Sequence, residues 1–594
     1  MSFTEAMKIV GKALTISFRT RSRVSIAITI LGFVMAFLPV LISITLRQFT
    51  DEVQALHGKG TEQVSLALGT FGILMVLYIS QLLYSGLQNY YTGIDTLNVQ
   101  AYIKETILRC TCRVKYKYLE SYDDFKEKIV FAETYAGYRV AQSMQSITAW
   151  LQNLLAFLSI IYVLYEVNGW IVAALIATSI PAVILAYKQK DEDYRLKTKW
   201  MKEGAFVIHY FHDCCAPRSL NEVRFFGIFD FLKQKWRSSA DQYIAVKNKM
   251  TKVHVLYNAI ADLLRNSVYI VIVIIVVQEI FHNPAIGLGA FMLVLTLAGQ
   301  LQEVTAKLFV GSAYFISDIR YMRDFLDLEN IEQENLDDAA TPFDQADICF
   351  QNVHFSYPGS AYPALQQLNV TIKQGEKVAI VGENGSGKTT FVNLLCGMHE
   401  PDSGTITVNG QHITERLSAV RRSLSAVFQD FGKYEATIRD NITVSDSRKT
   451  CSDEALSKLS EQTGALDFIK DQPRRFNEIV GSFNDDGNNL SGGQWQKLAI
   501  TRAAYRDQAR VMILDEPTAA LDPIAESDLY RNFSKLTADK TTILISHRLG
   551  IASIVDRVLV FDKGRIVEDG SHSALLSKNG LYAKLYRSQA KFYV

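Results

Sequence analysis

The chain has few cysteines and almost no net charge. These two features argue against a nucleic-acid partner, a cysteine metal site and a disulfide framework. Its 594 residues include only seven cysteines, and the formal net charge is +1. A near-neutral chain has no broad electrostatic attraction to nucleic acid, so nucleic acid is not expected as a partner. Cys110 and Cys112, and the adjacent Cys214 and Cys215, have no histidine or second cysteine pair at zinc-finger spacing. We therefore expect free thiols rather than metal ligands or a disulfide framework.

Long apolar runs are absent after residue 310, whereas the first half of the chain has several. The chain is too long for one domain, and this asymmetry indicates a membrane domain followed by a second domain. A membrane-spanning helix needs about 20 mostly apolar residues. On that basis the sequence predicts six spans, at residues 24–46, 66–88, 147–167, 169–187, 262–281 and 285–309. The first contains no charged residue, which favours a span over a buried helix of a soluble domain. The fifth is interrupted near its start by Asp262 and Arg265.

Lysine and arginine are concentrated in two long connections between the predicted spans. Residues 89–146 contain eight of them and residues 188–255 contain fourteen, whereas residues 47–65 contain two. Positively charged connections tend to stay in the cytoplasm, so both long connections, the N-terminus and the C-terminal domain are expected there. Residues 5–23 mix apolar and basic positions at helical spacing. They predict either an amphipathic helix on the inner membrane surface or a plain positively charged flank.

After residue 346 the chain changes to short β-branched strands that alternate with glycine-rich turns and helical segments. This alternation is typical of an α/β nucleotide-binding domain. The expected strands include residues 368–372, 377–381, 405–408, 426–428, 511–514, 542–545 and 557–561.

The segment that follows the strand at 377–381 fits the phosphate-binding loop G-x-x-x-x-G-K-[ST]. Its glycines let the backbone wrap phosphate groups, and the helix that starts there favours negative charge at its N-terminus. Lys388 is expected to contact the β- and γ-phosphates of a nucleotide, and the Thr389 hydroxyl to ligate Mg²⁺. The candidate nucleotide-binding residues of this loop are Gly382, Asn384, Gly385, Ser386, Gly387, Lys388, Thr389 and Thr390.

Two further motifs follow the phosphate loop in a fixed order. Residues Leu490–Gln494 have the sequence Leu-Ser-Gly-Gly-Gln, and an apolar strand then ends at Asp515 and Glu516. This order resembles the ATPases of ATP-binding cassette (ABC) transporters. The whole chain resembles an exporter-type half-transporter, a polytopic α-helical membrane domain with six transmembrane helices followed by an α/β P-loop ATPase domain.

The resemblance implies domain boundaries. We expect an N-terminal amphipathic segment at 1–23, a membrane domain at 24–328, a linker at 329–346 and the ATPase domain at 347–594. Within the cytoplasmic connections, the polar breaks near 118–125 and 212–222 are similar to the short coupling helices with which such exporters dock into the ATPase domain.

The resemblance also assigns roles to single residues. Asp515 is expected to hold Mg²⁺, and Glu516 to polarise the attacking water. Gln429 matches the glutamine that senses Mg²⁺ and water, and His547 matches the histidine that contacts the γ-phosphate. Tyr357 lies where the family stacks an aromatic ring on adenine.

The Leu490–Gln494 segment implies a dimer, because in this family it completes the ATP site of the opposing chain. The residues implied to contribute in this way are Ser491, Gly492, Gly493, Gln494 and Asp522. The partner is then a second half-transporter chain. The intact Glu516 and His547 favour a homodimer, and a heterodimer remains an alternative.

The cargo is less defined than the ATP site. Gln300, Glu303 and Lys307 fall on one face of the sixth span and are candidates to line a cavity, although Glu303 and Lys307 also fit an i,i+4 ion pair. Trp495 and the acidic stretch after Gly481 are similar to a bacterial subgroup that includes exporters of modified peptides.

These features imply ATP-driven export of a peptide or amphipathic small molecule across a bilayer, with the bacterial plasma membrane as the expected location. A lipid flippase or a chelate importer would share every motif. An ATP-gated channel or sensor is an alternative of a different class.

Overall fold

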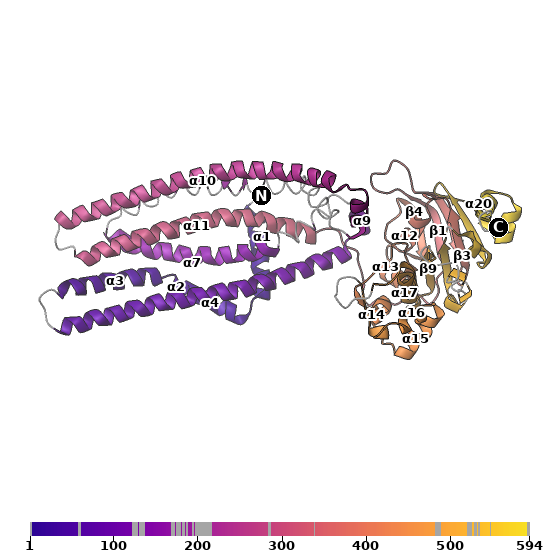
Figure 1. The fold of residues 1–594 in the computed structure, drawn as a ribbon, viewed down its shortest axis with the longest axis horizontal. Coiled ribbons are helices and arrows are strands. Elements are labelled where there is room, and N and C mark those ends of the chain that lie inside the picture. Colours follow the sequence, from indigo (N-terminus) through magenta and orange to yellow (C-terminus); the bar gives the residue numbers. More distant parts are fainter. Residues whose placement is uncertain are drawn as a thin grey trace. The chain divides into compact units, whose positions relative to one another are not determined.

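A computed structural model describes residues 3–56, 61–120, 137–167, 217–282, 287–337, 339–481, 489–518, 535–546 and 548–590, with a few short stretches between these ranges. The chain forms two compact units, each described here by itself (Figure 1). The first contains Met1–Cys112 and Tyr122–Glu332, and the second contains Arg113–Ser121 and Gln333–Val594.

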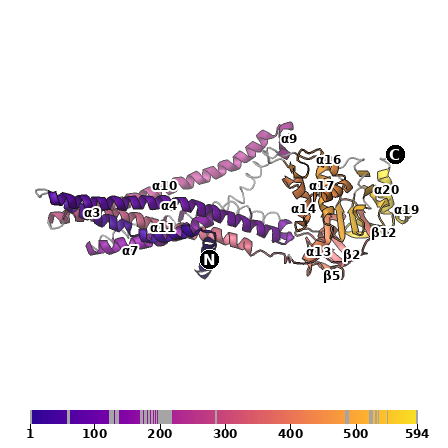
Figure 2. The same ribbon diagram turned by 90° about the horizontal axis from the view of Figure 1, so that it is seen from below.

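The first unit is built from long helices, and several of them continue well beyond the length of a membrane span. Figure 2 shows α10 diverging from α4 and α11 on its way to α9. The described helices of this unit are α1 (Phe3–Thr20), α2 (Arg23–Met35), α3 (Leu38–Ala55), α4 (Thr61–Arg113), α7 (Gly137–Val167), α9 (Pro217–Phe225), α10 (Phe229–His282) and α11 (Leu288–Glu329).

Within the described residues, three helical stretches are long and apolar enough to cross a bilayer, namely Val64–Arg113, Gln145–Glu166 and Leu288–Leu308. A fourth candidate is the bent pair α2 and α3. The fifth predicted span, residues 262–281, forms the last part of α10. The fourth, residues 169–187, lies almost entirely outside the described residues.

The first predicted span, residues 24–46, is not one continuous helix. α2 ends at Met35, and α3 starts at Leu38 with a bend of 41° between them. Pro39 lies in the first turn of α3, where its missing N–H is tolerated. In an unbroken helix Pro39 would leave the carbonyl of Met35 without its donor, so the helix breaks there.

α11 packs against α7 and α3 and forms the core of the first unit. Leu297 and Leu301 on α11 and Ile160 and Leu164 on α7 are all fully buried, at 0% exposure. α11 runs without interruption through the predicted sixth span and the amphipathic segment that follows it. One helix therefore joins the membrane domain to the start of the linker.

The second unit contains two main sheets. An antiparallel sheet has the order β2-β1-β4-β5, and a mostly parallel sheet has the order β12-β11-β3-β10-β9-β6. Their strands are β1 (Ile348–Phe355), β2 (Leu365–Ile372), β3 (Lys377–Gly382), β4 (Ser403–Val408), β5 (Gln411–His412), β6 (Leu424–Val427), β9 (Val511–Asp515), β10 (Thr541–Ile545), β11 (Arg557–Asp562) and β12 (Arg565–Gly570). A short pair, β7 (Ala436–Thr437) and β8 (Ile479–Val480), lies apart from both.

Helices surround these sheets, and one of them comes from the connection at residues 89–146, which the sequence predicts to be cytoplasmic. That helix is α5 (Tyr116–Glu120), and it belongs to the second unit. The others are α12 (Lys388–Leu395), α13 (Leu417–Ser423), α14 (Ile438–Thr443), α15 (Asp453–Gln462), α16 (Leu466–Lys470), α17 (Gly492–Tyr505), α19 (His572–Ser577) and α20 (Leu581–Ala590).

All seven predicted strands are present, within two or three residues at their ends. The buried faces of both sheets meet in one core, in which Phe350 of β1 stacks on Phe391 of α12 with ring centroids 4.4 Å apart. The parallel strands β3, β9 and β10 lie side by side, so their carboxyl ends reach the same edge of the sheet. Ligands of open α/β sheets bind at that edge.

Candidate functional site

The predicted phosphate loop joins β3 to α12, and its backbone packs closely against neighbouring segments. A side chain at Gly382 would place its Cβ 2.3 Å from the carbonyl oxygen of Phe561, and one at Gly387 would lie 2.9 Å from that of Ala364. Both glycines have positive φ, at +154° and +105°. Only glycine fits these two positions, which brings the backbone N–H groups of the loop close to any bound group.

Inside this loop, two polar side chains are buried and suited to an anion. Lys388 is only 6% exposed, and its Nζ donates to the carbonyl oxygens of Gly382 at 3.0 Å and Glu383 at 2.8 Å. The Ser386 hydroxyl is buried without a hydrogen-bond partner. A buried cation and an unpaired hydroxyl beside a helix N-terminus are the groups that phosphate binding needs.

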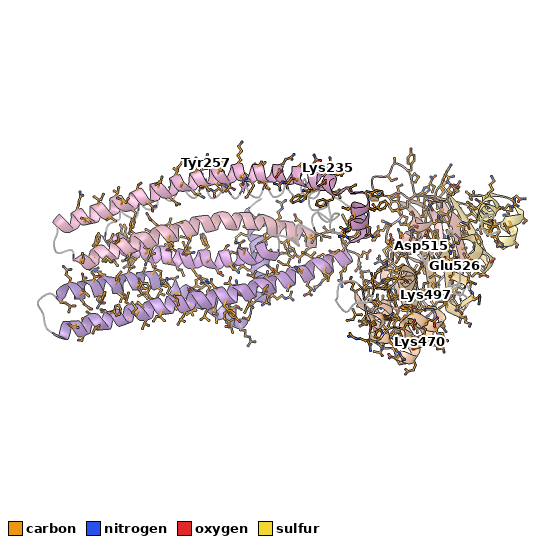
Figure 3. The ribbon with its side chains drawn as sticks, viewed as in Figure 1. Lys235, Tyr257, Lys470, Lys497, Asp515 and Glu526 are labelled. Atoms are coloured by element: carbon orange, nitrogen blue, oxygen red, sulfur yellow. The ribbon has the colours of Figure 1, made fainter. Side chains whose placement is uncertain are left out.

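Two acidic side chains face this lysine from the end of β9. Asp515 pairs with Ile545 of β10 and is 2% exposed; Figure 3 places it within the second unit. Burial, reinforced by the charge of Glu516, raises the pKa of Asp515 to about 6, and Lys388 opposes this. Burial lowers the pKa of Lys388, while Glu516 and Asp515 act in the opposite direction. The three groups therefore form one electrostatic cluster.

The oxygen-bearing side chains at this cluster suit Mg²⁺. The carboxylate of Asp515, the exposed hydroxyl of Thr389 and the amide of Gln429 are the predicted ligands, and hard oxygen donors are what Mg²⁺ prefers. Across the part of the chain that the structure describes, no three His, Cys, Asp or Glu side chains gather as a metal cage. Mg²⁺ sites with substrate phosphates use only one or two protein carboxylates, so the donor set fits.

Glu516 is held in an unusual backbone conformation. Its φ is +50°, in the left-handed region that non-glycine residues rarely adopt. Its N–H donates to the carbonyl oxygen of Ile545 at 2.9 Å, and Gln496 Nε2 donates to its carbonyl oxygen at 3.0 Å. These two bonds fix the backbone, and Gln429 Nε2 donates to the Glu516 carboxylate at 3.3 Å. The structure therefore brings together Gln429 and Glu516, which the sequence predicted separately.

Gln496 is a functional candidate that the sequence reasoning missed. It lies on α17, is 3% exposed, and has the buried residues Trp495, Leu498 and Ala499 as neighbours on that helix. A glutamine among buried positions of a helix needs a polar partner in the interior. That pattern was visible in the sequence and could have marked Gln496.

Tyr357, the predicted adenine contact, is linked to the phosphate loop. Its hydroxyl lies 3.1 Å from the hydroxyl of Thr390 on α12. Its ring packs edge-on against Phe355 at 5.0 Å and His399 at 5.5 Å between centroids. The ring is half-buried, so one side remains available for a ligand.

The Leu490–Gln494 segment starts α17. Ser491 and Gln494 form a reciprocal cap, in which the Ser491 hydroxyl accepts from the Gln494 N–H at 3.3 Å and the Gln494 side chain accepts from the Ser491 N–H at 2.8 Å. Ser491 and Gly492 are exposed, and Gly493 is half-buried. Two other predicted residues, Asp522 and His547, lie outside the described residues.

The cavity candidates of the membrane domain are not gathered in one place. Gln300 accepts a hydrogen bond from Ser43 of α3 at 3.4 Å. Glu303 and Lys307 form the i,i+4 ion pair, 2.6 Å apart, on the exposed face of α11. The ion-pair alternative is therefore what these two residues adopt, and a role for Gln300 and Glu303 in binding cargo stays a prediction.

Comparisons with known proteins agree with this architecture. A family model described as ABC transporter matches residues 365–519. The subtilin transport ATP-binding protein of Bacillus subtilis is 31% identical over 541 residues, covering 89% of this chain and 86% of that protein. The nisin transport ATP-binding protein of Lactococcus lactis subsp. lactis is 26% identical over 604 residues, covering 97% and 95%. An ATP-dependent lipid A-core flippase of Alcanivorax borkumensis is 30% identical over 429 residues, 71% of each chain.

The solved structure of a bacterial Atm1-family ABC exporter with ATP bound has the same fold, with a TM-score of 0.81 and 22% identity over 96% of this chain and 98% of that one. The fold and the site thus define a helical membrane domain joined to a P-loop ATPase. The chain belongs to the ABC transporter family. It is an ATP-binding ATPase coupled to transport, and it has the exporter fold.

Proposed function

We propose that the protein exports a peptide or an amphipathic small molecule from the cytoplasm. The observation that carries this proposal is the extent of the match to the subtilin transport protein, which covers 89% of this chain. A match of that length includes the membrane domain, where cargo would bind, and is not confined to the ATPase domain. The nisin transport protein matches over an even larger share, 97% of the chain.

In the proposed ATP site, the residues of the phosphate loop bind and orient the triphosphate. The Lys388 ammonium exchanges its carbonyl partners at Gly382 and Glu383 for phosphate oxygens, and Tyr357 stacks on adenine. Mg²⁺ held by Asp515, Thr389 and Gln429 would neutralise charge on the β- and γ-phosphates. Glu516 accepts a proton from the attacking water, and Gln429 holds the carboxylate in place.

The proposed functional unit is a homodimer. Ser491 and Gly492 are exposed at the start of α17, so their N–H groups and the Ser491 hydroxyl are accessible to a phosphate bound by a second chain. ATP would then close two ATPase domains against each other, and hydrolysis would release them, which alternates the access of the cargo site. A heterodimer would use the same contacts.

The proposed location is the plasma membrane of a bacterium, with the N-terminus and the ATPase domain in the cytoplasm. The support is the excess of lysine and arginine in residues 89–146 and 188–255. The same orientation places the ATPase where ATP is available.

A lipid flippase is the second candidate function. The observation that favours it is the similarity to a lipid A-core flippase over 71% of the chain at 30% identity. That match is shorter than the match to the subtilin transport protein, so peptide or amphiphile export is preferred.

Comparing cells that express the native protein with cells that express Glu516→Gln tests this choice. Mass spectrometry would survey peptides and small molecules in the medium and the cytosol. A compound that disappears from the medium and accumulates in the cytosol supports export and identifies the cargo. Unchanged compounds together with altered lipid asymmetry of the membrane would instead support the flippase.

A further inference from the structure

A short part of the first cytoplasmic connection packs on the ATPase domain, within the second unit. Val114 pairs with Gln333 of the linker in an antiparallel bridge, and the Glu334 N–H donates to the carbonyl oxygen of Arg113 at 2.7 Å. Lys115 Nζ lies 3.0 Å from Glu400 Oε1. Residues 113–120 are covalently continuous with α4, so this segment is the direct extension of a predicted membrane span.

The ring of Tyr116, the first residue of α5, contacts His399. The two ring centroids are 5.2 Å apart, with an edge-to-face angle of 85°. His399 is 6% exposed and follows the end of α12 by only a few residues. The Tyr116 ring of the cytoplasmic connection thus packs against the buried imidazole of His399.

His399 also contacts the ring of Tyr357, the predicted adenine contact. His399 meets Tyr357 edge-to-face, with centroids 5.5 Å apart and an angle of 89°, and it also contacts Phe355 at 5.0 Å. The Tyr357 hydroxyl then reaches Thr390 on the helix of the phosphate loop at 3.1 Å. A continuous series of contacts therefore connects Tyr116, His399, Tyr357 and Thr390.

We infer that His399 is a positioning residue that couples the cytoplasmic connection to the ATP site by fixing the orientation of the Tyr357 ring. Edge-to-face packing is directional, so a shift of the Tyr116 ring changes the preferred position of His399 and, through it, that of Tyr357. Movement of residues 113–120 then alters how well adenine is held, and bound adenine restrains residues 113–120 in return. This inference rests on the proposed stacking of Tyr357 on adenine.

The competing explanation is that His399 only fills space under β1. The two explanations differ in what a change at Tyr116 does. If His399 merely fills space, removing the Tyr116 ring leaves ATP affinity unchanged. If His399 transmits position, removing the Tyr116 ring weakens ATP binding although the site itself is intact.

The experiment uses the full-length protein in lipid nanodiscs and measures ATPase activity against ATP and against GTP. The variants are Tyr357→Ala, His399→Ala, His399→Phe, Tyr116→Ala and the double variant Tyr116→Ala/His399→Ala. Leu119→Ala, an exposed position on the same short helix, is the matched control. Thermal unfolding of each variant shows whether the fold is retained.

The half-saturating ATP concentration is expected to rise roughly two- to tenfold for His399→Ala and for Tyr116→Ala, with little change in kcat. That range corresponds to the contribution of one aromatic pair to binding. His399→Phe should restore it, because it keeps a flat ring. The double variant should be no worse than His399→Ala alone, since both changes break the same series of contacts. The preference for ATP over GTP should fall in parallel.

A normal half-saturating concentration in Tyr116→Ala, or a double variant whose effect is the product of the two single effects, would overturn the coupling role of His399. If Tyr357→Ala itself leaves ATP affinity unchanged, Tyr357 does not stack on adenine, and that part of the proposed ATP site is contradicted. If Tyr357→Ala weakens ATP binding but His399→Ala and Tyr116→Ala do not, the adenine contact stands and only this inference fails.

Discussion

Gln429 Nε2 lies 3.3 Å from Glu516 Oε2 and donates a hydrogen bond to it, although the two residues are 87 positions apart in the chain. β6, which leads to Gln429, pairs with β9, which ends just before Glu516. The parallel pairing of these strands brings the amide to the carboxylate. The contact places Gln429, a proposed Mg²⁺ ligand, directly on the proposed base.

Replacing Glu516 with glutamine should leave ATP binding intact and lower hydrolysis by about a hundredfold or more, because the base that accepts the proton of water is lost. Binding of a fluorescent ATP analogue and phosphate release, measured on the same preparation, separate the two effects. Asp539→Asn, at another acidic position with positive φ in the same domain, is the matched control. Residual turnover near the wild-type rate would remove Glu516 from its role.

Gln496→Leu should lower kcat by about tenfold while the half-saturating ATP concentration changes little, because a shifted base slows the chemical step more than binding. The leucine keeps the volume of the side chain but cannot donate to the carbonyl oxygen of Glu516, whose strained backbone then relaxes. Lys497→Ala, the next residue of α17, is the control. Equal kcat values for Gln496→Leu and Lys497→Ala would contradict the positioning role.

The ion pair between Arg21 and Asp95 should be essential for the fold of the membrane domain. Arg21 Nε lies 3.1 Å from Asp95 Oδ2, both side chains are about nine-tenths buried, and Ser25 donates to the same carboxylate at 2.8 Å. Arg21→Met leaves a buried unpaired carboxylate and should destabilise the protein by about 3 kcal/mol. Thermal unfolding in detergent measures this loss.

The control for that experiment is Arg19→Met, an exposed position two residues earlier. The double variant Arg21→Met/Asp95→Leu should recover part of the stability, because two apolar side chains leave no unpaired charge. A double variant less stable than Arg21→Met alone would show that the pair is not the source of the loss.

Alkaline pH should destabilise the ATPase domain partly through Tyr582. This residue is fully buried, its hydroxyl lies 2.6 Å from His572 Nδ1, and burial raises its pKa to about 12 from an ordinary 10.0. The unfolded chain loses this proton at a lower pH than the folded one. The stabilisation from Tyr582 is therefore complete below pH 10 and is lost as the pH rises through about 12.

Tyr582→Phe tests this effect because phenylalanine has no proton to lose. Between pH 10 and 12 the unfolding midpoint of the variant should fall less than that of the native protein, by an amount equivalent to about 2 kcal/mol. Tyr434→Phe, at a half-exposed tyrosine of the same domain, is the control. Parallel loss of stability in the native protein and Tyr582→Phe would contradict the assignment.

Local features of the ATPase domain could be predicted because they depend on nearby residues. The strand at 377–381 and the phosphate loop after it need only β-branched residues, glycines and a lysine at fixed spacing. The cap joins Ser491 to Gln494, only three positions further along the chain. β1 is less regular than the strands named in advance, because its bulges at Phe350–Phe355 break the simple period of a strand.

In the membrane domain, composition predicted where helices form but not their continuity. The break after Met35 depends on one proline, and its angle depends on how α2 and α3 pack. The sequence also left open whether Glu303 and Lys307 line a cavity or pair with each other; the structure shows the pair, and a role for Glu303 in binding cargo stays a prediction.

The sequence by itself determined the chemical class of this protein, because the phosphate loop, the Leu490–Gln494 segment and Asp515–Glu516 are short motifs whose chemistry depends on adjacent residues. Tertiary structure alone decided which distant side chains meet. It placed Gln429 and Gln496 on Glu516, and Tyr116 on His399. Such contacts depend on strand pairing and on the packing of segments that are distant in the chain, by 87 residues for Gln429 and Glu516, and a local sequence pattern does not specify them.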